Sequence, residues 1–114
     1  MDSQKFVDVI TKVVLESSVD GMKKKLEQPA GRSPAKEIVE MSTWYNNLNE
    51  SDKQIVLNIV IKSVKDAVFG FLCVLDGAAA IEDKDKGTLK LYYENHDKSV
   101  LLNDQHKVNL HELL

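Results

Sequence analysis

The segment Ser51–Leu75 constrains the fold of this chain most, because it is the longest stretch with a helical apolar period. At about 100° per residue its aliphatic and aromatic residues fall on one wide arc, with polar residues opposite. Lys62, Lys65 and Asp66 stand in the middle of the segment, where each charge would be costly in a bilayer. The segment therefore predicts a helix that is not a membrane span.

The ends of this helix are also marked in the sequence. Ser51 with Gln54 has the spacing of a capping box, and Gly77 is suited to a C-terminal stop. The apolar arc is wider than a simple surface helix needs. We therefore expect a central core helix that other elements cover on at least two sides.

Length and composition indicate one domain over residues 1–114. The chain has 114 residues, of which 43% are hydrophobic and 29% charged, enough for a core of its own. A formal net charge of -3 is unfavourable for nucleic-acid binding and compatible with a basic partner. The single cysteine, Cys73, excludes an intramolecular disulfide. The first residues lack the pattern of a secretory leader, so we expect a cytoplasmic protein.

The N-terminal residues predict a helix from Asp2 to about Glu16, capped by Asp2 or Ser3. Apolar residues recur there at helical spacing: Phe6, Val9, Ile10, Val13 and Val14. The stripe then rotates, so the helix either bends near Ser17–Gly21 or splits into two pieces there. The sequence favours neither alternative.

A second helix is expected after the loop Gln28–Ser33, with Pro34 at the favoured first position. Its inward stripe consists of Ile38, Met41, Tyr45 and Leu48, with Trp44 beside it. The connection from Asn46 to Glu50 is short. Short connections join antiparallel neighbours, so we predict an αα-hairpin with the helix Ser51–Leu75.

Near the C-terminus the apolar period changes from helical to alternating. Thr88–Glu94 predicts a strand, Asn95–Lys98 a turn and Ser99–Asn103 a returning strand. Two strands alone are marginal in water, so this hairpin must lie on the helices or pair with something else. Leu110, Leu113 and Leu114 predict a short helical turn capped by Asn109. The expected class is α+β, predominantly helical: a three-to-four-helix body, one C-terminal antiparallel β-hairpin and a short terminal helix.

Residue spacings do not indicate an enzyme, a metal site or a cofactor. His106 and His111 lack a third ligand, and Asp83–Gly87 meets only part of a calcium-loop pattern. Glu37 and Glu40 lie in the first turns of a predicted helix, where carboxylates stabilise the helix dipole. The glycines are isolated, so no phosphate-binding loop is present. We predict a protein without catalytic residues or cofactors.

A basic cluster and one aromatic residue are the remaining candidates for binding. Lys23–Lys25 could contact phosphates or an acidic partner, although a solvated helix face explains them more simply. Phe69 falls among the polar residues of its helix, where it is either covered by the hairpin or exposed to a partner. We predict a protein partner, or a second copy of the chain, that binds at Phe69, Tyr92, Glu94 and Asp97.

The late segments resemble a group of small proteins. They are LDGAAAIED, GTLKLYYE and VLLND, followed by the terminal LHELL, and they resemble small stand-alone bacterial proteins of unassigned function, some of the immunity-protein type. The resemblance implies a non-catalytic interaction domain, for instance one that binds and blocks a toxin. Other hypotheses are a self-associating structural or regulatory domain, a small enzyme and a nucleic-acid binder.

Overall fold

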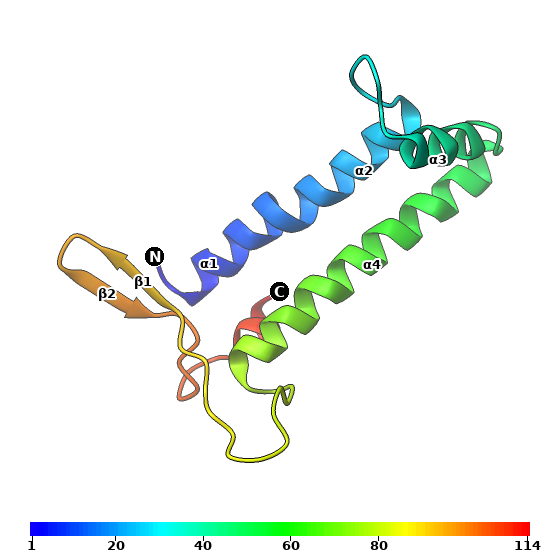
Figure 1. Cartoon of the computed structure of the whole chain (residues 1–114). Helices are drawn as coiled ribbons and strands as arrows, with labels where there is room; N and C mark the ends of the chain where they lie inside the picture. Colours follow the sequence, from blue (N-terminus) through cyan, green and yellow to red (C-terminus); the bar gives the residue numbers. More distant parts are fainter. The chain divides into compact units, whose positions relative to one another are not determined.

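A computed structural model describes residues 1–114 and is α+β, mainly helical, as predicted (Figure 1). The elements are α1 (Ser3–Ile10), the π-helical η1 (Thr11–Glu16), α2 (Ser17–Glu27), α3 (Lys36–Asn46), α4 (Glu50–Asp76), β1 (Tyr92–Asn95), β2 (Lys98–Leu101) and the 3-10 helix η2 (Leu110–Leu113). Their contacts define a terminal unit, residues 1–14 and 66–114, and a middle unit, residues 15–65. None of the helices combines the length and apolar character needed to cross a membrane. The single-domain assignment stays a prediction.

The first helical stretch is not split at Ser17–Gly21, because these residues lie within α2. Asp2 is its N-cap, with a side-chain oxygen 2.8 Å from the Lys5 amide nitrogen, as one predicted alternative had it. The departure from α-helical geometry lies about one turn earlier, in η1, where the backbone is π-helical. Such π segments change which residues share a face. This accounts for the rotation of the apolar stripe without a break in the helix.

The core of the terminal unit joins α1, the C-terminal part of α4 and η2. Val7, Leu72 and Leu110 are its fully buried members. Around them pack partly buried residues: Phe6, Val68, Leu75, Leu113 and Leu114. Val7 was not in the predicted stripe, whereas Val13, which was, is 62% exposed. The N- and C-terminal segments are therefore held together by one small apolar cluster.

Asn109 occupies the N-cap position of the C-terminal turn, as predicted, but a carboxylate from α4 supplies the side-chain acceptor. Asp76 Oδ1 accepts the Leu110 N–H at 3.0 Å, and Asp76 Oδ2 accepts the His111 N–H at 2.8 Å. The Asn109 side chain instead donates to Glu112 at 3.1 Å and makes no cap bond. The predicted cap position is confirmed, whereas the capping side chain comes from a residue distant in sequence.

In the middle unit, α3 packs on α2. Leu26, Ser42 and Tyr45 are buried, and Ser42 Oγ donates to the Leu26 carbonyl at 2.8 Å. Asn46 Nδ2 also donates to the Leu26 carbonyl, at 3.1 Å. These bonds satisfy a helix-end carbonyl that would otherwise lack a partner. The predicted antiparallel hairpin of α3 with α4 is thus replaced by an α2–α3 pair.

The starts of α3 and α4 also differ from the predictions. α3 begins at Lys36, after Ala35, so Pro34 lies outside it. Asn49, not Ser51, caps α4, because its side-chain oxygen lies 2.8 Å from the Asp52 amide nitrogen. Both helices begin within two residues of the expected positions. A neighbouring polar residue made the better cap in α4.

α4 ends as predicted but is not a core helix. Gly77 follows it with φ +74°, a left-handed conformation that glycine adopts without strain. Only Leu72 and Asp76 of this helix are buried, while Ile55, Ile59 and Phe71 are more than half exposed. The periodicity correctly predicts an apolar arc. It does not specify whether this chain or another molecule covers that arc.

Candidate partner-binding surface

The hairpin is shorter than predicted and closes through a two-residue loop. Tyr92 pairs with Leu101 and Asn95 with Lys98, which leaves His96 and Asp97 in the loop. His96 has φ +55°. A left-handed first loop residue gives a twist that matches the twist of the flanking strands. The loop is therefore of the tight kind that fixes strand register.

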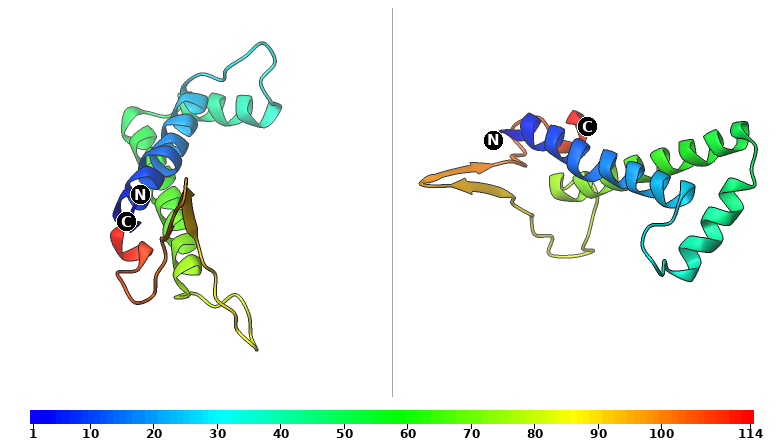
Figure 2. Two further views of the ribbon diagram at one scale, coloured as in Figure 1. Left: turned by 90° about the vertical axis from the view of Figure 1, so that its left-hand side faces the viewer. Right: turned by 90° about the horizontal axis from the view of Figure 1, so that it is seen from above.

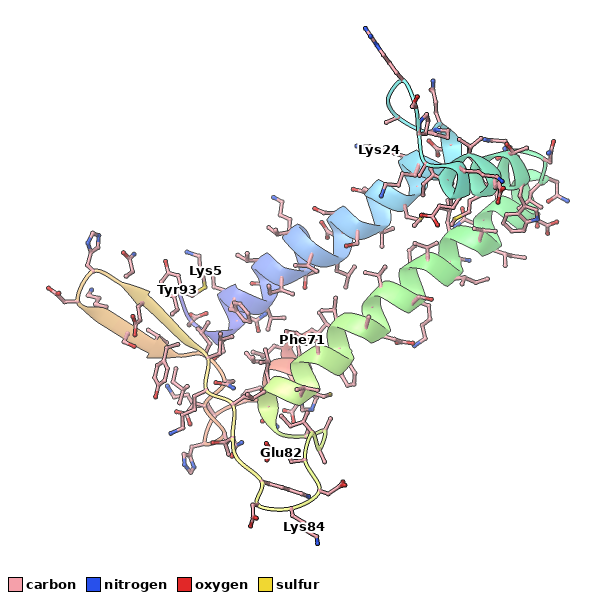
Figure 3. All side chains as sticks on the ribbon, in the orientation of Figure 1. Lys5, Lys24, Phe71, Glu82, Lys84 and Tyr93 are labelled. Carbon is pink, nitrogen blue, oxygen red and sulfur yellow. The ribbon has the colours of Figure 1, made fainter.

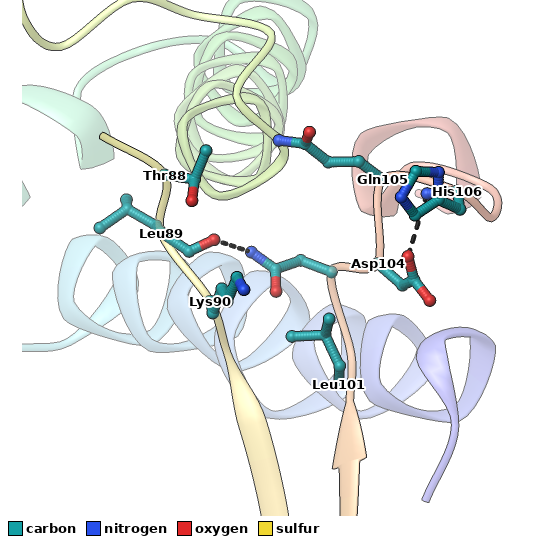
Figure 4. A pocket seen from close by; sticks show the side chains of 8 residues that line it. Thr88, Leu89, Lys90, Leu101, Asp104, Gln105 and His106 are labelled. Carbon is teal, nitrogen blue, oxygen red and sulfur yellow. Dashed lines mark hydrogen bonds between the residues drawn. The ribbon is translucent and has the colours of Figure 1, made fainter. Parts of the chain in front are cut away.

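The base of the hairpin is anchored by the side chain of Asn103, which is 4% exposed. Its Nδ2 donates to the carbonyls of Leu75 at 2.6 Å and Leu89 at 2.9 Å, and its Oδ1 accepts the Leu91 N–H at 2.8 Å. Figure 4 draws the bond at Leu89 as a dashed line. Ser3 Oγ adds a bond of 2.7 Å to a carbonyl at the base of β2. A hollow of about 140 Å³ lies beside Asn103. The amide of Asn103 is therefore hydrogen-bonded within the fold at both its nitrogen and its oxygen.

Beyond its base the hairpin is uncovered. Every residue of β1 is exposed, and so are three of the four residues of β2. Figures 1 and 2 show the two strands extending past the start of α1. The expectation that the hairpin lies on the helices was wrong. The remaining alternative, that it pairs with something else, is the one that bears on function.

The two faces of the hairpin differ in character. Tyr93 and Val100 lie opposite each other and, with Met1, line the apolar part of a hollow of about 360 Å³. These three side chains are between 36% and 38% exposed. The rest of the lining is polar and comes from the hairpin tip: Asn95, His96, Asp97 and Lys98. Toward the base the same face ends on buried Leu102. This side, which we call the Tyr93 face, is apolar and half-exposed toward the core and polar toward the tip.

The opposite face carries Tyr92 and Glu94. Tyr92 is 51% exposed and pairs with Leu101, while Glu94 pairs with Ser99. The aromatic ring and the carboxylate lie two residues apart on one strand, so both point to the same side. This side, which we call the Tyr92 face, offers one large ring beside one negative charge.

The outer edges of both strands carry unpaired backbone groups. The Leu102 N–H donates to the Leu91 carbonyl at 2.8 Å, which makes this pair a hydrogen-bonded one. Hydrogen-bonded and non-hydrogen-bonded pairs alternate along an antiparallel ladder. Hence Tyr92 and Glu94 on β1, and their partners on β2, direct their N–H and C=O groups outward. Such edges accept a further strand.

The structure brings together three of the four residues predicted for partner binding. Tyr92 and Glu94 lie on one face of the hairpin and Asp97 at its tip. Phe69 lies apart on α4, where its ring meets the His111 ring edge to face, with centroids 5.5 Å apart. It is 44% exposed, so the C-terminal turn, and not the hairpin, covers part of it.

Sequence reasoning missed Met1, Tyr93 and Val100 as surface residues. In the alternating segment, Tyr93 falls on the same face as Leu89 and Leu91, the face that would be covered if the hairpin lay on the helices. In the structure, this face of the hairpin is exposed to solvent beyond the residue pair nearest the core. The alternating apolar pattern was present in the sequence, but the helices were assumed to cover the apolar face.

Other candidate sites show ordinary surface geometry. No group of three or more His, Cys, Asp or Glu side chains is placed to hold a metal ion. In the loop before β1, Glu82 accepts the Gly87 N–H at 3.1 Å, and Glu82 and Lys84 are exposed (Figure 3). Among the basic residues, Lys23 lies 4.0 Å from Glu27 on the exposed surface of α2.

Comparison of the chain with protein-family models, with curated proteins and with solved structures finds no match.

Proposed function

We propose that this protein is a non-catalytic interaction domain that binds a protein partner through its β-hairpin. The observation that carries the proposal is a hairpin anchored at its base by Asn103 and uncovered along both strands. Two strands in isolation are marginal in water. A third strand from a partner would pair the open backbone groups and cover apolar area.

The two faces suggest how such a partner is recognised. An extended segment added at the β1 edge would bond to the outward groups of Tyr92 and Glu94. Alternate side chains of that segment would lie on the Tyr93 face, where the hollow of about 360 Å³ can take an apolar group. The others would lie beside Glu94, whose charge favours a basic side chain.

An immunity protein is a specific version of this proposal. In it the partner is a toxin domain with a basic surface, which the chain binds and blocks. The net charge of -3 and the carboxylates of Glu94 and Asp97 support this version. Replacing Glu94 or Asp97 by Lys would then weaken binding most at low salt, where electrostatic attraction is strongest.

Two proline substitutions test which edge is used. Glu94→Pro removes one outward N–H from β1, and Ser99→Pro removes the corresponding one from β2. Neither touches the inner ladder, and proline is tolerated at outward positions of edge strands. With a candidate toxin domain, or a protein captured by the full chain, the dissociation constant should rise about tenfold for one variant and little for the other.

Substitutions on the faces complete the experiment. Tyr93→Ala tests the Tyr93 face, while Tyr92→Ala and Glu94→Lys test the other. Each variant is checked for retained fold by circular dichroism. If all of these variants, and a deletion of the hairpin tip, bind like the wild type, the hairpin is not the binding surface.

A further inference from the structure

A second, unrelated surface lies on α4. Helical spacing places six residues in one row, at successive steps of four and three residues: Ile55, Ile59, Lys62, Asp66, Phe69 and Cys73. Steps of four and three are the spacing of a coiled-coil seam. All six belong to one helix, so this row, which we call the α4 row, is a property of α4 by itself.

The apolar members of the α4 row are open to solvent. Ile55 is 53% exposed, Ile59 59% and Phe69 44%. Lys62 and Asp66 are exposed and occupy its centre. Burying β-branched and aromatic side chains away from water lowers the free energy. Such a row therefore favours association with another helix.

The order of the charges selects a second copy as that helix. If two α4 helices pair antiparallel about residue 64, Lys62 of each copy faces Asp66 of the other. Ile59 then faces Phe69, and Ile55 faces Cys73. A parallel pairing would instead set Lys62 against Lys62. The row is thus complementary to itself in the way that a two-fold symmetric interface requires.

The helix itself is long enough for such an interface, because the 27 residues of α4 span about 40 Å. A standard complex buries about 800 Å² on each partner. We propose that the protein forms an antiparallel homodimer through the α4 row.

Lys62 and Asp66 each also interact within their own chain, and the dimer contact adds to those interactions. The inference is independent of the hairpin proposal, because it uses no residue of either strand. A dimer without a hairpin partner, or a hairpin partner without a dimer, would separate the two.

The charge pair gives the sharpest test. Lys62→Glu makes both central residues of the row negative, and Asp66→Lys makes both positive. Each variant alone should dissociate to the mass of 12.8 kDa in light scattering. A one-to-one mixture should regain the dimer, since every facing pair is then of opposite charge. A purely intramolecular role of these residues would not be restored by mixing.

Apolar substitutions have matched controls on the same helix. Ile59→Ser and Phe69→Ser lie in the row, while Ile61→Ser and Phe71→Ser replace exposed residues outside it. The first two should raise the dimer dissociation constant about tenfold, as for central interface residues, and the other two by less than about twofold. If both sets of substitutions raised the dissociation constant equally, the dimer would not form through the α4 row.

Cross-linking tests the direction of pairing. In the antiparallel dimer the two Cys73 residues lie about 27 Å apart along the helix axes, so the wild type should not form a disulfide-linked dimer. Ile55→Cys places a thiol opposite Cys73 of the other copy and should cross-link on mild oxidation. A wild-type chain that is monomeric at about 0.2 mM, or that cross-links through Cys73 alone, would overturn the proposal.

Discussion

Asp76 and His111 are 35 residues apart in the sequence and are joined at two atoms. Asp76 Oδ2 accepts the backbone N–H of His111 at 2.8 Å and lies 2.8 Å from its Nδ1. The other carboxylate oxygen takes the Leu110 N–H. The last residue of α4 thereby caps the C-terminal turn and fixes it on the core of the terminal unit.

Asp76→Ala is expected to lower the free energy of unfolding by about 2–3 kcal/mol, because it leaves one buried and one partly buried N–H group without acceptors. Asp76→Asn keeps one acceptor oxygen and should lose less. Denaturant titration followed by circular dichroism measures both. Asp83→Ala, in an exposed loop, is the control and should stay within about 0.5 kcal/mol of the wild type. A loss no larger than the control's would contradict the capping role.

Asn103→Asp is expected to release the hairpin from the terminal unit. A carboxylate cannot donate, so the carbonyls of Leu75 and Leu89 would face negative charge in place of an amide N–H. Hydrogen exchange at the Leu91 amide should speed up at least about tenfold. Asn109→Asp, which alters a solvent-exposed bond, is the control. Unchanged exchange at Leu91 would show that other contacts hold the base.

Two glycines should respond oppositely to alanine. Gly77 has φ +74°, and a Cβ there would lie 3.0 Å from Gln105 Nε2, so Gly77→Ala should destabilise by about 1–2 kcal/mol. At Gly21, in α2, a Cβ would meet nothing within 4 Å. Gly21→Ala should therefore stabilise the chain by about 0.5–1 kcal/mol, through helix propensity. Thermal unfolding of both variants checks the signs, and a shared sign would be inconsistent with these backbone conformations.

His96 in the hairpin loop gives a test of local strain. Its φ of +55° suits asparagine and is unfavourable for a β-branched residue. His96→Asn should stabilise the hairpin by about 0.5 kcal/mol, and His96→Val should destabilise it by about 1–2 kcal/mol. Strand chemical shifts report the hairpin population. His106→Val, in another loop, should leave those shifts unchanged.

Much of the secondary structure could be predicted because it depends on the spacing of apolar residues that are close in sequence. Helical periodicity located α1 and α4, and the alternating residues before Asn95 located the hairpin. The contacts that place the elements could not be predicted. The side chains of Asp76 and Asn103 bond to atoms far along the chain and leave no periodic signal.

The candidate surface was only partly predictable for the same reason. Tyr92, Glu94 and Asp97 stood out as exposed residues of a hairpin. Tyr93 and Val100 did not, since a pattern that marks an apolar face does not show which molecule covers it. The same holds for the α4 row, because the helical period of α4 does not show which molecule covers its apolar residues.

The central claim is that a partner pairs with the open edge of the hairpin, and amide hydrogen exchange at Glu94 and Ser99 tests it most directly. In the free chain both N–H groups point outward, so they should exchange faster than the laddered N–H of Tyr93. In the complex, the amide on the bound edge should slow by about tenfold or more. If neither amide slows when the partner is bound, the partner does not add a strand to this hairpin.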